Sequence, residues 1–174
     1  MRDRLRLLKG VRRVYYDIFS RFYDGFVAVH SRDKLGAART FLVDRVPLQA
    51  GGSVLDLCTG TGTLLTYLQA KVGPSDQVVG VDFSPGMLKT AHKRTQGFPN
   101  VALVRADADS LPFAPGMFDA VTFSHVFYEL KRETQKRALQ EIVRSPPELS
   151  LLRIFAIPQV LNRACARRRP NVLL

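Results

Sequence analysis

The chain has 174 residues, 46% of them hydrophobic, which is enough apolar material for one domain with its own core. Its apolar runs are far shorter than the roughly 20 residues of a transmembrane helix, and its N-terminus lacks the features of a secretory signal. The only cysteines, Cys58 and Cys165, have no metal-type spacing. These features predict a cytoplasmic protein with reduced thiols and no metal site.

The net charge of +11 is concentrated at the two ends of the chain. Residues 1–13 carry six Lys/Arg and one Asp, and residues 145–174 carry five Arg and one Glu, so the ends contribute +5 and +4. The basic ends are suited to lipid headgroups or nucleic acid, whereas the central part is nearly neutral. A purely solubilising role for the ends is the simpler alternative.

The N-terminal part has a helical pattern. Apolar residues recur at spacings of three and four, which predicts an amphipathic helix with basic residues on its other face. This apolar stripe consists of Leu5, Leu8, Val11, Tyr15, Ile18 and Phe22. A second helix is predicted over about residues 34–46, ending before Pro47.

From residue 53 onward, short apolar strands alternate with helices. Strands are predicted at residues 53–58, 77–82, 101–105 and 118–124, with helices at 64–72, after the N-cap Ser84, and at 132–144. This order predicts right-handed crossovers and an α/β fold with a doubly wound, mainly parallel sheet.

Two predicted strand ends carry residues suited to binding a nucleoside. Gly60 and Gly62 form a turn after the first strand, where backbone N–H groups can meet a ligand. Asp82 ends the next strand, where a carboxylate can accept both ribose hydroxyls of an adenosine group. A tight turn without a ligand and a helix-capping Asp are the simpler alternatives. Leu65 and the absence of Gly-Lys-Ser/Thr argue against dinucleotide and P-loop sites.

Four consecutive segments resemble the motifs of class I S-adenosylmethionine-dependent methyltransferases, which have a Rossmann-like fold. These segments are Asp56-x-x-x-Gly60-x-Gly62, Asp82-Phe83-Ser84-Pro85-x-Met87-Leu88, Asp107-Ala108-x-x-Leu111-Pro112-Phe113 and Phe118-Asp119-Ala120-Val121. The subgroup suggested contains the ubiquinone/menaquinone biosynthesis C-methyltransferases (methyltransferase type 11). The resemblance runs from roughly residue 16 to residue 144 and implies S-adenosylmethionine as the cofactor.

The resemblance also implies roles for individual residues. The turn from Asp56 to Gly62 would hold the methionine part of the cofactor, Asp82 the ribose, and Asp107 with the Ala108 N–H the adenine. Met87 would pack on the adenine, although core packing is an equal alternative, and Tyr23 would belong to a segment that closes over the cofactor. The implied cofactor-binding residues are Tyr23, Asp56, Leu57, Cys58, Thr59, Gly60, Gly62, Asp82, Phe83, Met87, Asp107, Ala108 and Ser124.

Candidate catalytic groups follow the fourth predicted strand, at the edge where an acceptor would approach. His125, and with less support Tyr128, could take a proton from the acceptor. The alternative is that His125 only shapes the pocket. Methyl transfer from a sulfonium depends on in-line positioning of the nucleophile, which requires no metal.

The sequence departs from the family after Arg144. Ser145-Pro146-Pro147-Glu148 stands in place of a Leu-Lys-Pro-Gly-Gly turn, and 17 residues follow the fifth strand predicted at residues 149–157. We therefore expect the last strands to be absent, through truncation or a frame shift. The apolar sheet edge left exposed favours a homodimer or low stability.

These patterns predict a single domain over residues 1–174. It would consist of a helical lid segment (1–46), a cofactor-binding core (53–144) and an atypical basic segment (145–174).

The predicted function is S-adenosylmethionine-dependent methyl transfer to a small-molecule or lipid/quinone-like acceptor by in-line displacement. A cofactor-binding remnant without turnover is one alternative. A nucleic-acid methyltransferase is a weaker one, because Ser124-His125-Val126-Phe127 stands where base-amino methylases carry an Asn/Asp-Pro-Pro-aromatic motif. The N-terminal stripe predicts either peripheral contact with an anionic membrane surface or a lid with the stripe buried over the cofactor site.

Overall fold

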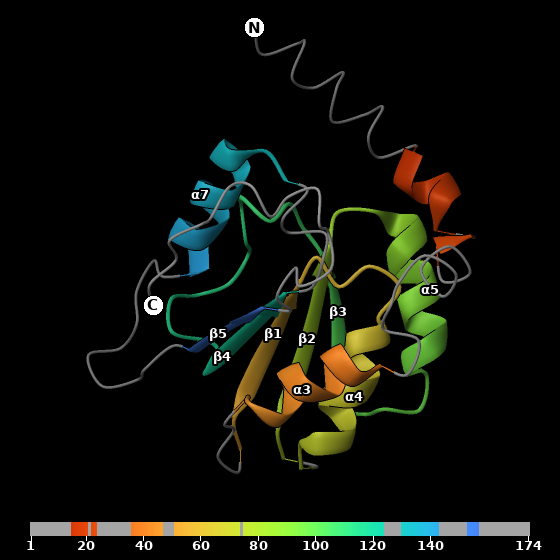
Figure 1. The fold of residues 1–174 in the computed structure, drawn as a ribbon, viewed down its shortest axis with the longest axis vertical. Coiled ribbons are helices and arrows are strands. Elements are labelled where there is room, and N and C mark those ends of the chain that lie inside the picture. Colours follow the sequence, from red (N-terminus) through yellow and green to blue (C-terminus); the bar gives the residue numbers. More distant parts are fainter. Residues whose placement is uncertain are drawn as a thin grey trace, which may run out of the picture.

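A computed structural model describes residues 15–20, 22–23, 36–46, 51–73, 75–123, 130–142 and 153–156 of the chain (Figure 1). The strands are β1 (Ser53–Leu57), β2 (Gln77–Asp82), β3 (Val101–Arg105), β4 (Ala120–Phe123) and β5 (Arg153–Ala156). The helices are α3 (Ala37–Asp44), α4 (Thr63–Lys71), α5 (Pro85–Thr95) and α7 (Arg132–Ile142). Residues 15–19 are also helical. No helix in these ranges is both long and apolar enough to span a membrane.

The strands form one parallel sheet in the order β3-β2-β1-β4-β5. The chain starts at the centre with β1, moves outward through β2 and β3, and then crosses back to β4 and β5. This is a doubly wound topology, in which the carboxyl ends of all strands lie at one edge and ligands bind where the strand order reverses. The predicted α/β fold class is therefore confirmed.

Helices cover both faces of the sheet. Successive residues of a strand point to opposite faces, and because the strands are apolar on both faces, each face is buried. On one face, Val54 and Val78 pack with Leu42 of α3 and with Leu65 and Leu68 of α4. The opposite face has its own core, which is closed by the segment around α7 (Figure 1). The members of that core include Leu55, Leu57, Val79, Val81, Val121, Phe123, Leu130 and Ala138.

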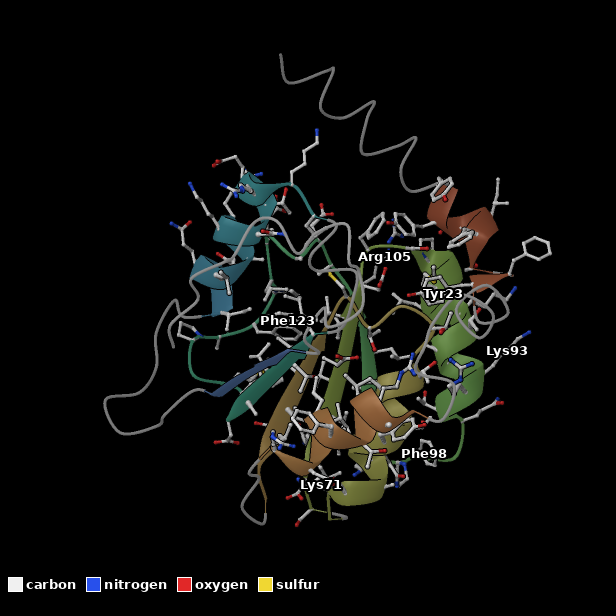
Figure 2. The ribbon with its side chains drawn as sticks, in the orientation of Figure 1. Tyr23, Lys71, Lys93, Phe98, Arg105 and Phe123 are labelled. Carbon is white, nitrogen blue, oxygen red and sulfur yellow. The ribbon has the colours of Figure 1, made fainter. Side chains whose placement is uncertain are left out.

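The N-terminus of α5 is capped as its residue types predict, and a lysine at the end of α4 attaches that helix to α3. The Ser84 Oγ accepts a hydrogen bond from the Met87 N–H at 3.2 Å, and Pro85 occupies the first helical position of α5. The Lys71 Nζ, near the base of the molecule in Figure 2, donates to the Val43 carbonyl and so ties the end of α4 to α3.

The predicted elements agree with the structure to within a few residues at most ends. Of the fifth predicted strand, residues 149–157, the structure describes the backbone of β5, which pairs with β4. The rest of that sheet edge, residues 1–14 of the predicted N-terminal helix and most of the basic C-terminal segment lie outside the described residues.

Close packing of α4 against α5 depends on Gly62. Its φ is +75°, and a Cβ built there would lie 2.8 Å from the Ala91 Cβ. We expect Gly62→Ala to lower the free energy of unfolding by roughly 1–3 kcal/mol, measured by urea denaturation. Gly97→Ala is the control, because Gly97 also has a positive φ, +94°, but a Cβ there would meet no atom of the part of the chain that the structure describes within 4 Å. Equal losses of unfolding free energy in Gly62→Ala and Gly97→Ala would contradict a steric clash at Gly62.

Candidate functional site

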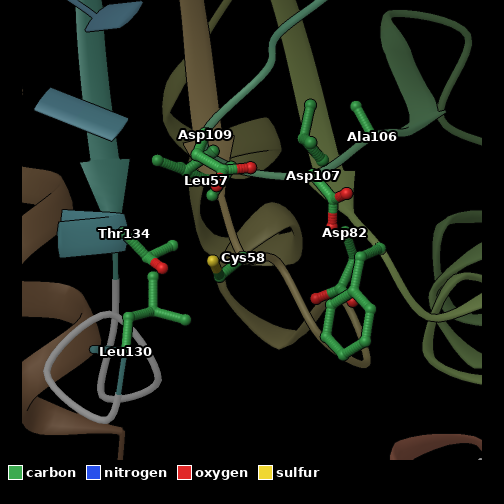
Figure 3. A pocket seen from close by; sticks show the side chains of 11 residues that line it. Leu57, Cys58, Asp82, Ala106, Asp107, Asp109, Leu130 and Thr134 are labelled. Atoms are coloured by element: carbon green, nitrogen blue, oxygen red, sulfur yellow. The ribbon is translucent and has the colours of Figure 1, made fainter. Parts of the chain in front are cut away.

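A pocket opens at the carboxyl ends of β1, β2 and β3 (Figure 3). Six of the predicted cofactor-binding residues line it: Leu57, Cys58, Asp82, Phe83, Asp107 and Ala108. The side nearest α7 is completed by three residues that no sequence motif marks, Asp109, Leu130 and Thr134. Among the residues that the structure describes, the lining contains three carboxylates and no Lys or Arg, so this part of the pocket suits a ligand with positive charge better than a phosphate.

The turn after β1 has an unusual backbone, and its first residue, Cys58, lines the pocket. Cys58, Gly60 and Gly62 all have left-handed φ values, of 58°, 57° and 75°. The Thr59 N–H donates to the Val81 carbonyl at 2.9 Å, which fixes the turn to β2. A Cβ built on Gly60 would meet no atom of the described residues within 4 Å, so no described side chain crowds the turn there. This geometry allows a ligand to approach the backbone closely.

The carboxylate of Asp82 connects this turn to the start of α5. It is 6% exposed, and its Oδ2 accepts from the Gly60 N–H at 2.9 Å. Its Oδ1 accepts from the Ser84 N–H, also at 2.9 Å. A carboxylate has about four acceptor positions, so these two backbone bonds hold the group in place and are compatible with further bonds to ribose hydroxyls.

Asp56 lies beneath the turn and does not line the pocket. It is 1% exposed, and it accepts hydrogen bonds from the Thr59 Oγ1 at 2.7 Å and the Thr122 Oγ1 at 3.0 Å. Burial raises the pKa of Asp56 to about 7, although both hydroxyl groups oppose the shift. Asp56 therefore supports the turn from below and joins it to β4.

Arg94 holds the far side of the same turn. Its Nη1 donates to the Thr61 carbonyl at 2.6 Å, to the Thr61 Oγ1 at 3.0 Å and to the Thr63 Oγ1 at 2.8 Å. Arg94 could not be predicted from the sequence, because it is separated from the turn by more than 30 residues and belongs to no motif. Only the packing of α5 beside α4 brings the two together.

The loop that carries Asp107 and Ala108 is fixed to α7. The Arg137 Nη2 lies 3.1 Å from the Asp109 Oδ2, and the Leu111 N–H donates to the Glu141 Oε2 at 3.2 Å. These contacts place Thr134 opposite the ends of β2 and β3, on the other side of the pocket (Figure 3). Met87, in contrast, is buried in α5 and does not line the pocket.

The N-terminal helical residues pack at the end of β2. The Tyr16 and Phe83 rings meet edge to face at 5.5 Å, and the Tyr23 ring meets Phe19 in the same way at 5.6 Å. Figure 2 shows Tyr23 on the side of the molecule that carries α5. The N-terminal segment thus contacts Phe83, which lines the pocket.

The described part of the apolar stripe faces outward. Tyr15, Ile18 and Phe22 are 58%, 61% and 67% exposed. The alternative of a lid with its stripe buried over the cofactor site is therefore wrong for these residues. The helix packs on the protein through the neighbouring face, which contains Tyr16 and the buried Ser20. On this face Tyr16 contacts Phe83, and the Asp17 carboxylate accepts a hydrogen bond from the Gly86 N–H of α5.

Three predicted site residues, Ser124, His125 and Tyr128, lie outside the described residues. Within the described ranges, no group of three or more His, Cys, Asp and Glu side chains could hold a metal ion.

The sequence profile of a family described as a methyltransferase domain matches residues 54–145. The chain belongs to this methyltransferase family. The match confirms the predicted class I family and agrees with its cofactor, S-adenosylmethionine. The described lining of the pocket fits this cofactor, because S-adenosylmethionine is a cationic sulfonium without phosphate and the described lining residues include three carboxylates and no Lys or Arg.

Curated relatives include the demethylmenaquinone methyltransferase of Staphylococcus aureus, which is 35% identical over 122 residues. The match covers 70% of this chain and 50% of the relative, so the chain spans about half the length of the curated relatives it matches.

Solved structures with this fold include a chain of the Haloferax volcanii complex between the Trm112 methyltransferase activator and a methyltransferase. It has a TM-score of 0.62 at 26% identity, covering 73% of this chain and 53% of that one. A S-adenosylmethionine-dependent methyltransferase from Aquifex aeolicus has a TM-score of 0.61 at 24% identity, covering 72% and 68%. The second likeness concerns the fold alone.

The raised pKa of Asp56 makes the stability of this methyltransferase domain depend on pH. Between its ordinary value of 3.8 and about 7, the folded protein holds a proton that the unfolded chain has lost. The free energy of unfolding should therefore fall as pH rises through this window, by up to about 1.4 kcal/mol per pH unit. Asp56→Asn should remove this contribution. Urea denaturation of both proteins between pH 5 and 8 checks it, and identical pH profiles would contradict a proton on Asp56.

Proposed function

We propose that this chain binds S-adenosylmethionine in the pocket at the ends of β1, β2 and β3 and transfers its methyl group to an acceptor. The observation that carries the proposal is the Asp82 carboxylate, held by the Gly60 and Ser84 N–H groups in a pocket whose described lining contains two further carboxylates. Bound cofactor supplies an electrophilic methyl group on a sulfonium.

The residues of the chain bind and orient the reacting groups. The turn with Gly60 would take the methionine part, Asp82 the ribose hydroxyls, and Asp107 with the Ala108 N–H the adenine. The lack of crowding at Gly60 by any described side chain and the attachment of the adenine loop to α7 support this orientation. His125 and Tyr128 remain candidates for taking a proton from the acceptor, and we propose that residues 1–174 act as one domain.

The acceptor we propose is a lipid-like or quinone-like small molecule. The name of the Staphylococcus aureus relative specifies a demethylmenaquinone, which is consistent with this class. We further propose that the protein acts in the cytoplasm and contacts a membrane surface through its N-terminal segment. Two observations support this contact: the exposed apolar face formed by Tyr15, Ile18 and Phe22, and the six Lys/Arg of residues 1–13.

Removing the Asp82 side chain tests the cofactor site. Asp82→Ala should weaken binding of S-adenosylhomocysteine by roughly 1.5–3 kcal/mol, or about 10- to 150-fold, because hydrogen bonds to a charged group are lost. Isothermal titration calorimetry measures this. Asp119→Ala is the matched control, because Asp119 also anchors a strand, accepting from the Ser53 N–H at 2.7 Å, but at the opposite end of β1.

Unchanged affinity in folded Asp82→Ala would overturn the ribose assignment. Methyl-transfer assays on quinone-like acceptors then separate an enzyme from a remnant. Tight binding of S-adenosylhomocysteine without turnover on any acceptor class would favour the remnant.

Replacing the exposed apolar face tests the membrane contact. The triple variant Tyr15→Ser, Ile18→Ser, Phe22→Ser should lose most of its co-sedimentation with phosphatidylglycerol vesicles, because about 25 cal/mol per Å² of apolar burial is removed. Phe41→Ser is the control, since Phe41 is 48% exposed on α3, outside this face. Binding of the unmodified protein should weaken with salt, because the Debye length is about 8 Å at physiological ionic strength. Equal co-sedimentation of all three proteins would contradict the assignment.

A further inference from the structure

Asp17 reaches across the molecule to the first turn of α5. Its Oδ1 accepts hydrogen bonds from the Ser84 Oγ at 2.5 Å and from the Gly86 N–H at 3.0 Å. The first N–H groups of a helix have no partner within the helix, and a carboxylate is favoured there. Ser84 caps the Met87 N–H, so Asp17 completes the N-terminal cap of α5 from 67 residues away.

Gly86 permits this approach. A Cβ built on Gly86 would lie 2.8 Å from the Asp17 Cα and 2.9 Å from the Asp17 carbonyl oxygen, so any larger residue would separate the two helices. The Ser20 Oγ donates to the same carbonyl at 2.7 Å and is buried. The N-terminal helical residues therefore lie directly on the start of α5, held by polar contacts.

These contacts continue into the cofactor site. From Asp17 a hydrogen bond leads to Ser84, whose N–H donates to Asp82. Asp82 in turn accepts from the Gly60 N–H. The Tyr16 ring rests against Phe83, between Asp82 and Ser84 in the sequence. A displacement of the N-terminal segment would thus release Ser84 and Phe83, which flank the carboxylate proposed to bind ribose.

We propose that Asp17 is a positioning residue for the cofactor site, and that docking of residues 15–20 on α5 and binding of the cofactor stabilise each other. This inference rests on the proposed binding of S-adenosylmethionine. Because linkage is reciprocal, the docked segment raises cofactor affinity, and bound cofactor strengthens docking by the same factor. A coupling of this kind typically changes affinity by about 5- to 150-fold.

The test combines titration of the full chain with S-adenosylhomocysteine and hydrogen exchange of residues 15–20. In the unmodified protein, the ligand should slow exchange in this segment. Asp17→Ala should bind S-adenosylhomocysteine about 5- to 30-fold more weakly and lose most of the ligand-induced slowing of exchange in residues 15–20. Asp17→Asn, which keeps the acceptor oxygen, should be intermediate. Asp44→Ala removes an exposed carboxylate on α3 and should match the unmodified protein.

The outcomes separate this inference from the proposed function. If Asp17→Ala and Asp17→Asn bind the ligand as tightly as the unmodified protein, while only their melting temperatures fall, Asp17 is a helix cap and the inference is wrong. If ligand binding weakens but exchange of residues 15–20 never responds to the ligand, the reciprocal coupling is wrong. If the unmodified protein does not bind S-adenosylhomocysteine, both the proposed function and the inference are overturned.

Discussion

The pocket of this methyltransferase domain depends on one buried carboxylate. Asp82 ends β2, and its two oxygens accept from backbone N–H groups on either side, at Gly60 and at Ser84. A buried carboxylate without such partners would be strongly unfavourable, so the turn after β1 and the start of α5 are held at fixed positions relative to β2. The same bonds that stabilise the charge therefore hold the carboxylate in the wall of the pocket.

Parallel pairing extends this constraint to the other half of the sheet. Asp56 and Thr122 are register partners on β1 and β4, and their side chains are hydrogen bonded. Thr59 bonds the other oxygen of Asp56, so the turn is tied to β4 as well as to β2. Residues 124–129, proposed to meet the acceptor, follow β4 directly in the sequence. The pairing of β1 with β4 thus fixes the turn after β1 relative to β4, the strand that precedes the candidate catalytic residues.

The sequence predicted the parts of this arrangement that are local. Apolar runs marked the strands, glycines marked the turn, and Asp82 was placed at a strand end because strand and carboxylate are adjacent in the chain. It did not predict the contacts of Arg94, Arg137 and Asp17, since each joins helices or loops distant in sequence and leaves no spacing pattern. Helical periodicity found the N-terminal stripe but could not decide which face packs on the protein, because the inner face is held by the capping bonds of Asp17 and by the contact of Tyr16 with Phe83, neither of which leaves a spacing pattern.

The N-terminal segment has two distinct surfaces, because the face with Asp17 packs on the protein and the described part of the apolar stripe is exposed. A surface helix of a globular protein normally turns its apolar face to the core. Here Asp17 and Ser20 face α5, and Tyr15, Ile18 and Phe22 face outward next to a strongly basic stretch of sequence. An exposed apolar face of this kind is typical of an interaction surface. If it binds lipid while Asp17 holds the segment on α5, linkage requires that lipid contact which stabilises the docked segment also strengthens cofactor binding. A protein with a lipid-like acceptor would then hold its cofactor most tightly where that acceptor is found.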